Sequence, residues 1–190
     1  MLSSASRPST LRLFFALWPD SAMRDRLCRH QALWSWEPPA RPTPESKLHL
    51  TLLFMDGVPV DQLGVARELG EAVSREWTDF DLLLDRAAVW RQGGIAHLAP
   101  SRIPPCLRDV HATLAAQAAR CGLPFDARPY APHVTLGRRA DRLTAPAAFS
   151  PLRWPVRDFV LVQSVLGTGR YAVLGRWPSH PSPPRERGGE

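Results

Sequence analysis

A tetrapeptide of the form His-x-Thr-Leu occurs three times in this chain. The copies are His49-Leu50-Thr51-Leu52, His111-Ala112-Thr113-Leu114 and His133-Val134-Thr135-Leu136. Histidine both takes and gives protons near neutral pH, because its ordinary pKa lies in that range. A threonine hydroxyl beside it donates one hydrogen bond and accepts others. The repeated pairing indicates acid–base chemistry on a ligand that offers oxygen acceptors.

The sequence around each copy decides whether its histidine and threonine share a face. KLHLTLLF (47–54) and the segment at 132–138 have the apolar character of strands, in which residues i and i+2 lie on one face, about 6 to 7 Å apart. His49 therefore pairs with Thr51, and His133 with Thr135. The opposite face of the first strand is predicted to hold Leu48, Leu50, Leu52 and Phe54.

The middle copy lies in an alanine-rich segment, RDVHATLAAQAARCG, whose composition predicts a helix. Residues two apart are about 200° apart around a helix axis. Thr113 then points away from His111, and this copy is predicted to be a coincidence.

Two His-x-Thr pairs that face each other across a cleft suit phosphodiester hydrolysis. A neutral imidazole takes a proton from water, and a protonated imidazole gives one to the departing sugar oxygen. Each threonine hydroxyl donates a hydrogen bond to a non-bridging phosphate oxygen, where charge builds in the transition state.

Charge points to an anionic partner. The formal net charge is +6, and every basic residue except Lys47 is an arginine. Guanidinium groups bind phosphate in a two-pronged geometry, which favours a phosphate-bearing partner. A GC-rich genome would also enrich arginine, alanine and proline, so composition alone leaves both explanations open.

Compartment and domain organisation follow from composition. Three cysteines, Cys28, Cys106 and Cys121, fit no disulfide framework and no paired metal spacing, which favours a reducing cytoplasm. The apolar run 11–18 is too short to span a membrane. We expect one domain over residues 11–178 and a monomeric chain, with tails at 1–10 and 179–190 rich in Pro, Ser, Gly and charge.

The body alternates strand-like and helix-like segments. Helices are expected at about 21–33, 60–77 and 104–120, the first two capped by Asp20 and Asp61. Strands are expected at 11–18, 47–54, 80–90, 95–99, 132–138, 156–166 and 170–177, with Gly93-Gly94 forming a hairpin turn. This order favours an α+β fold with mostly antiparallel sheets.

At the two strand motifs the chain resembles a known family. KLHLTLLF and APHVTLGR are similar to the two HxTx motifs of the two-histidine phosphoesterase superfamily, in its RNA 2′,3′-cyclic phosphodiesterase branch, historically the 2′-5′ RNA ligases. RLFFAL at 12–17 and GRYAVLGRW at 169–177 resemble its opening and closing strands. The resemblance implies a bilobal fold with a pseudo-twofold, two mostly antiparallel sheets, and a central cleft with one motif from each lobe.

The resemblance also implies an activity and roles. The reaction is hydrolysis of an RNA terminal 2′,3′-cyclic phosphate to a 2′-phosphomonoester, with reverse 2′-5′ ligation as the same chemistry run backwards. Carried over by motif position, His49 is the proton donor, His133 is the proton acceptor, and Thr51 and Thr135 hold the phosphate. The partners are RNA 3′ ends or nucleotide cyclic phosphates.

Several other residues are candidates for substrate binding. Arg139 has the parity of His133 if the strand continues past Gly137, whereas Arg138 has the opposite parity. Arg170 and Tyr171 follow a Gly-Thr-Gly turn and would present a cation and a ring to a nucleotide. Phe14 or Phe15 could stack on a base, while the other is core. Arg41 and Arg91 are candidates by the resemblance. Trp90 is expected to pack in the interior, and His97 is given no role.

Metal chemistry and rival functions complete the expectations. A zinc site needs three or four converging ligands, and neither motif has a carboxylate on its histidine face, so we expect no metal and no other cofactor. Two alternatives to an RNA phosphodiesterase stay open. One is a noncatalytic module that binds RNA ends, and the other is a phosphodiesterase for a small nucleotide such as an ADP-ribose cyclic phosphate.

Overall fold

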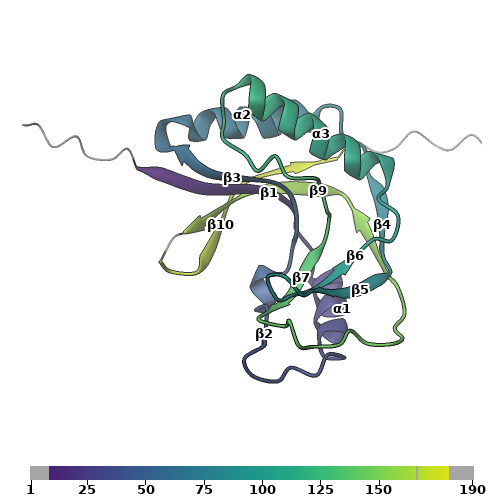
Figure 1. Cartoon of the computed structure of the whole chain (residues 1–190). Coiled ribbons are helices and arrows are strands. Elements are labelled where there is room, and N and C mark those ends of the chain that lie inside the picture. Colours follow the sequence, from purple (N-terminus) through teal and green to yellow (C-terminus); the bar gives the residue numbers. More distant parts are fainter. Residues whose placement is uncertain (1–8, 166, 180–190) are drawn as a thin grey trace, which may run out of the picture.

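The computed structural model describes residues 9–165 and 167–179, which form an α+β fold (Figure 1). The α-helices within these ranges are α1 (Ser21–Gln31), α2 (Leu63–Ser74) and α3 (Pro105–Arg120). The strands are β1 (Thr10–Leu17), β2 (Arg41–Pro42), β3 (Leu50–Pro59), β4 (Phe80–Leu84), β5 (Arg86–Trp90), β6 (Ile95–Ala99), β7 (Val134–Arg138), β8 (Leu152–Val156), β9 (Asp158–Val165) and β10 (Arg170–Pro178).

Strand pairing confirms the predicted mostly antiparallel architecture. An eight-stranded sheet has the order β10-β9-β1-β3-β7-β6-β5, with β2 beside β7, and β4 pairs with β8 in a two-stranded sheet. Neighbouring strands run antiparallel throughout these pairs. Side chains therefore alternate between the two faces of each strand, and one face of the large sheet can carry a site while the other is buried.

The large sheet consists of two halves joined at a narrow point. Strands β10, β9, β1 and β3 form one half, which α2 and α3 cover, and β7, β6 and β5 form the other (Figure 1). The link is the pairing of Leu50 in β3 with Val134 in β7. Both His-x-Thr motifs therefore lie at the junction of the halves, on adjoining strands of one sheet rather than on two separate sheets.

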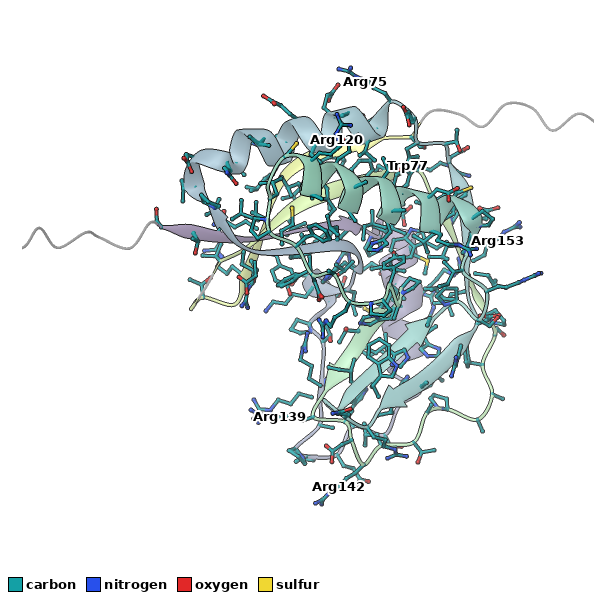
Figure 2. The ribbon with its side chains drawn as sticks, turned by 45° about the horizontal axis from the view of Figure 1, so that its top comes forward. Arg75, Trp77, Arg120, Arg139, Arg142 and Arg153 are labelled. Atoms are coloured by element: carbon teal, nitrogen blue, oxygen red, sulfur yellow. The ribbon has the colours of Figure 1, made fainter. Side chains whose placement is uncertain are left out.

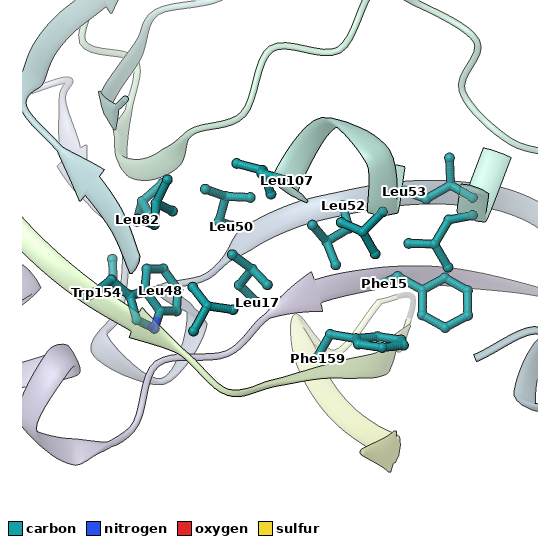
Figure 3. Packing of buried hydrophobic residues seen from close by; sticks show 14 of the residues in the cluster. Phe15, Leu17, Leu48, Leu50, Leu52, Leu53, Leu82, Leu107, Trp154 and Phe159 are labelled. Carbon is teal, nitrogen blue, oxygen red and sulfur yellow. The ribbon is translucent and has the colours of Figure 1, made fainter. Parts of the chain in front are cut away.

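The core explains why the motif strands are held in place. Leu48, Leu50 and Leu52 are almost fully buried, as the alternation predicted. They pack with Leu17 of β1 and Leu107 of α3 (Figure 3). Burial of each such side chain contributes about 1.5–3 kcal/mol. The apolar half of each motif thus anchors the strand, and the polar half is left on the other face.

Segment 80–90 was predicted as one strand, which was wrong. The chain breaks at Asp85, so β4 joins β8 in the small sheet and β5 joins the large one. The Asp85 carboxylate accepts hydrogen bonds from the backbone N–H and the hydroxyl of Ser101 at 2.7 and 2.6 Å. These bonds fix the bend between the two strands, and an aspartate in mid-strand was its only sequence signal.

Other boundaries differ from the predictions by smaller amounts. Asp20 caps α1 as expected, accepting from the Met23 N–H at 2.7 Å. Asp61 does not cap α2, because a 3₁₀ turn at Val60–Gln62 precedes that helix. Most of the two predicted tails, including His180, lies outside the described residues. Of the tail residues that the structure describes, Thr10 already belongs to β1, and the Ser179 hydroxyl donates to the Arg157 carbonyl at 2.8 Å.

Candidate active site

The strand register brings the two motifs together. Leu50 pairs with Val134 in antiparallel strands, and these two residues are the middle positions of the two motifs, so His49 and Thr51 flank one member of the pair and His133 and Thr135 flank the other. Two imidazoles and two hydroxyls thus form a compact group on one face of the sheet. All four side chains line one cleft of about 640 Å³.

Each motif histidine is held in one tautomer by the backbone two residues before it. Nδ1–H of His49 donates to the Lys47 carbonyl at 2.6 Å, and Nδ1–H of His133 donates to the Ala131 carbonyl at 2.8 Å. A carbonyl oxygen only accepts, so Nδ1 carries the proton in both rings. In the neutral ring Nε2 then has the free lone pair, and this nitrogen is available to exchange protons with a ligand.

An aromatic cage surrounds His49. The ring of Phe14 stacks on it at a centroid distance of 4.8 Å, Trp18 stacks at 5.7 Å, and Tyr171 meets it edge-on at 5.6 Å. Phe15, the neighbour of Phe14, lies in the main core instead. The expectation that one of these two phenylalanines is core is confirmed for Phe15, and Phe14 lines the cleft although only 3% of it is exposed; stacking of Phe14 on a base stays a prediction.

Burial lowers the pKa of both motif histidines. The pKa of His49 falls from 6.5 to about 4, because the charged ring loses water; proximity of His133 and Arg138 lowers it further, while the bond to Lys47 opposes the change. Burial also lowers the pKa of His133, against its bond to Ala131. Both rings are thus predominantly neutral at pH 7 in the empty cleft, and a bound anion would favour their protonated forms.

The cleft wall is cationic. Arg12, Arg41, Lys47, Arg138 and Arg139 line it, and its described lining contains no carboxylate. Among these five, only Arg12 has an acidic partner in the described part of the chain, Asp56 at 2.8 Å. The remaining positive charge is available to an anionic ligand. Arg139 extends from the end of β7 toward the open side of the molecule (Figure 2).

The predicted binding residues divide into two groups. Phe14, Arg41, Arg139 and Tyr171 line the cleft with the catalytic candidates. Arg91 and Arg170 lie outside this lining. Arg91 donates to the Asp141 carbonyl. The Arg170 backbone N–H bonds the Thr168 hydroxyl in the turn between β9 and β10, at 3.1 Å, with the side chain exposed.

Strict strand alternation failed at two places beside the motifs. Phe54 was predicted on the face opposite Thr51, yet both line the cleft. The β1–β3 register shifts between Phe15 and Ala16, so Leu52 has no partner residue on β1 in that ladder. Leu52 and Leu53 are both buried, and the alternation of faces starts again after them, which brings Phe54 to the cleft side.

Arg138 was predicted on the face away from His133, but it also lines the cleft. The strand ends there, and Arg139 has a left-handed backbone with φ of 56°. Gly137 allows this end to form, since a Cβ there would lie 2.2 Å from the ring of Trp36. The glycine before two arginines was the signal that regular alternation would stop.

Two rings beside His133, those of Trp90 and His97, were missed. Trp90 was expected in the interior, but 39% of it is exposed, and its ring lies 4.5 Å from that of His133. His97 is buried, with its ring 4.3 Å from Trp90 and 5.8 Å from His133. Strands β5 and β6 are short hairpin partners, and only the pairing of β6 with β7 shows that the rings of this hairpin meet the motif.

His111 behaves as predicted. It lies on α3, where its Nδ1–H donates to the Leu52 carbonyl at 2.7 Å and its ring stacks on Tyr130 at 3.9 Å. Thr113 of the same copy faces a separate hollow between α2 and α3. The third His-x-Thr therefore does not form a pair.

Two searches over the described residues bear on other classes of protein. No group of three or more His, Cys, Asp and Glu side chains in 9–165 and 167–179 converges in a way that would hold a metal ion. None of the helices found in those ranges is long and apolar enough to cross a membrane.

Two His-x-Thr pairs on adjoining strands of an antiparallel sheet, facing a cationic cleft, define a two-histidine phosphoesterase. Comparison with known proteins gives the family. A family model described as the 2′-5′ RNA ligase superfamily matches residues 19–168, and the chain belongs to this family.

Individual relatives cover nearly the whole chain. An RNA 2′,3′-cyclic phosphodiesterase of Escherichia coli is 31% identical over 87% of this chain and 95% of the relative. A protein of the same name from Thermus thermophilus is 30% identical over 82% of this chain and 83% of the relative. The crystal structure of E. coli LigT complexed with 3′-AMP superimposes with a TM-score of 0.74 at 30% identity, over 90% of this chain and 99% of that one.

Proposed function

We propose that this chain is a hydrolase that opens the 2′,3′-cyclic phosphate at the 3′ end of RNA and leaves a 2′-phosphomonoester. The observation that carries the proposal is the matched pair of histidines, each with Nδ1–H bound to the carbonyl two residues earlier and each lining the same cationic cleft. The activity named for the two curated relatives is the same reaction.

Each side chain has a role that its position supports. His133 Nε2 takes a proton from water, and the water oxygen forms the new bond to phosphorus. The bond from phosphorus to O3′ breaks, and protonated His49 gives its proton to O3′. Thr51 and Thr135 donate hydrogen bonds to the non-bridging oxygens, and Arg138, Arg139 and Arg41 balance the growing charge. If a 5′ hydroxyl replaces water, the same transfers give 2′-5′ ligation.

The depressed pKa of His49 fits a proton donor once substrate is bound. A phosphodiester anion beside the ring favours the imidazolium, which counteracts the effect of burial. The aromatic cage then keeps water away from the charged ring. Tyr171, which is half-buried and meets Phe14 edge-on at 5.2 Å, also offers a ring to the terminal base or ribose.

Metal independence, a monomeric state and a cytoplasmic setting belong to the same proposal. Two imidazoles and an arginine wall supply the proton transfers and charge balance without a metal. One chain contributes every residue used in the mechanism, which supports a monomer. The thiols of Cys28, Cys106 and Cys121 are all free, which supports a reducing compartment.

One assay tests the proposal. Purified protein in EDTA is given an oligoribonucleotide that ends in a 2′,3′-cyclic phosphate, and digestion of the product shows which ribose oxygen keeps the phosphate. We expect a 2′-monoester. His49→Ala and His133→Ala should each lower kcat by about 10²- to 10⁴-fold. Thr51→Ala and Thr135→Ala should lower it as well, whereas Thr113→Ala, from the copy on α3, should not.

Other outcomes select the alternatives. Unchanged oligonucleotide with salt-sensitive binding would support a noncatalytic module for RNA ends. Turnover of a small nucleotide cyclic phosphate with no turnover of the oligonucleotide would support a metabolite phosphodiesterase.

A further inference from the structure

A second pocket, of about 580 Å³, adjoins the catalytic cleft. Thr51, Phe54 and His133 line both hollows, so they form the ridge between them. The pocket is also lined by Leu52, Leu53, Trp90, His111, Asp126, Arg128, Pro129, Tyr130 and Ala131. Its volume lies within the roughly 300–1,000 Å³ that is usual for ligand sites. The mechanism proposed above uses none of the residues beyond the ridge.

The chemistry of the pocket differs from that of the cleft. Its one cation, Arg128, bonds the carboxylate of Asp126 and is thereby neutralised. Tyr130 and His111 stack in parallel at 3.9 Å with an angle of 4° between their rings. A neutral pocket lined by aromatic rings suits a nucleobase, whereas the cationic cleft suits the phosphate.

Trp90 offers the stacking surface. This residue is 39% exposed although its ring contacts two histidines, with centroids 4.3 Å from His97 and 4.5 Å from His133. His97 is buried, with 3% exposed, and its Nδ1–H donates to the Ile95 carbonyl at 3.2 Å. The buried imidazole of His97 therefore supports one side of the Trp90 indole, and another side of the indole remains accessible to a ligand.

The position of the pocket identifies which base it would take. His133 lines the pocket and His49 does not. In the proposed mechanism His133 takes the proton of the nucleophile, and the nucleophile attacks phosphorus from the side opposite the departing O3′. The ribose that carries the cyclic phosphate lies on the His49 side. The pocket therefore adjoins the nucleophile, on the far side of phosphorus from the RNA that carries the cyclic end.

We propose that this pocket binds the base of a second nucleoside, whose 5′ hydroxyl takes the place of the attacking water. The 5′ hydroxyl gives its proton to His133, its oxygen bonds to phosphorus, the bond to O3′ breaks, and His49 protonates O3′. The product is a 2′-5′ phosphodiester, and no further reactant is needed. This inference rests on the proposed function and assigns it an acceptor site.

The test measures how the reaction divides between water and an alcohol. An oligoribonucleotide with a blocked 5′ end and a 2′,3′-cyclic phosphate is incubated with protein and either adenosine or methyl riboside, which has the same 5′ hydroxyl but no base. We expect the ratio of diester to monoester to be at least about fivefold higher with adenosine, and to saturate with its concentration. 5′-Deoxyadenosine, which has the base but no 5′ hydroxyl, should suppress the adenosine product.

Substitutions test where the acceptor base binds. The measured quantity is the ratio of diester to monoester, so a general loss of turnover does not change it. Trp90→Ala should lower the adenosine ratio to that of methyl riboside, while Trp90→Phe should retain part of the preference. Leu83→Ala removes a comparably exposed apolar side chain on β4 and should leave the ratio unchanged.

Three outcomes separate the ideas. Monoester formation with equal ratios for adenosine and methyl riboside would overturn the acceptor site and leave the proposed hydrolysis intact. Absence of both products would count against the proposed function itself. If Trp90→Ala instead raises KM for longer oligonucleotides and leaves the adenosine ratio unchanged, the pocket takes an upstream base of the substrate, and the acceptor assignment is wrong.

Discussion

Opening the aromatic cage around His49 should raise the pKa of this histidine. Burial lowers that pKa from 6.5 to about 4, and three rings, those of Phe14, Trp18 and Tyr171, lie against the imidazole. If the three share the effect about equally, loss of one ring raises the pKa of His49 by roughly 0.8. At pH 7 the protonated fraction of His49 would then rise about sevenfold in Phe14→Ala and in Tyr171→Ala.

NMR titration of the histidine Cε1–H resonances measures this directly, with His49→Gln used to assign the signal. Phe14 is buried, and truncation of a buried Phe costs about 3–5 kcal/mol of stability. Tyr171 on the edge strand β10 is only half-buried and gives the same test with less risk to the fold. Phe54→Ala is the control for loosening of the cleft, because that ring lies in the same cleft beside Arg12 and opposite Phe14 on the neighbouring strand, but is not one of the three cage rings.

The result has a functional counterpart. The alkaline limb of kcat/KM should move upward by the same amount as the pKa of His49, because this limb reports loss of the donor proton in the free enzyme. A His49 pKa that stays unchanged or falls in both variants would refute the claim that these rings depress it. An upward change in Phe54→Ala of equal size would show that general loosening of the cleft, rather than the cage, is responsible.

Three further predictions test the same site and its support. The alkaline limb of kcat should lie at higher pH than that of kcat/KM, since bound phosphate raises the pKa of His49; coincident limbs would contradict this. Gly137→Ala should lower the free energy of unfolding in urea by about 1–3 kcal/mol and raise KM, because the added Cβ would lie 2.2 Å from the ring of Trp36. Gly64→Ala, where a Cβ would meet open space, should change neither the stability nor KM. Burial lowers the pKa of His30 to about 4, so the stability that its neutral ring contributes above pH 6.5 is lost as pH falls toward 4. In His30→Leu the free energy of unfolding should fall less steeply over this range, and an equally steep fall would exclude His30 as the cause.

Local features of this protein could be predicted from the sequence because they depend on neighbours in the chain. Periodicity and composition separated the two strand copies of His-x-Thr from the helical third copy. In the structure β3 begins at Leu50 and β7 at Val134, each directly after its motif histidine, and His111 lies on α3. The opposed roles of Phe14 and Phe15 followed from alternation along one strand. The α+β class followed from the order of the elements.

Where alternation was interrupted, sequence reasoning placed side chains on the wrong face. A single extra residue at Leu52 returned Phe54 to the cleft. The end of β7 after Gly137 brought Arg138 there as well. Both irregularities depend on what the partner strands and Trp36 do, and the chain on either side of them carries only weak signals. Phe80–Trp90 was taken as one strand for the same reason.

The sequence by itself determined which residues are candidates for the chemistry, because the spacing of histidine and threonine sets their shared face through backbone geometry alone. The tertiary structure decided what surrounds them. The pairing of Leu50 with Val134 joins the motifs. The pairing of β6 with β7 brings the β5–β6 hairpin, with Trp90 and His97, to His133, and the fold leaves Arg91 outside the cleft lining. These are contacts between segments far apart in the chain, and packing of the whole core sets them.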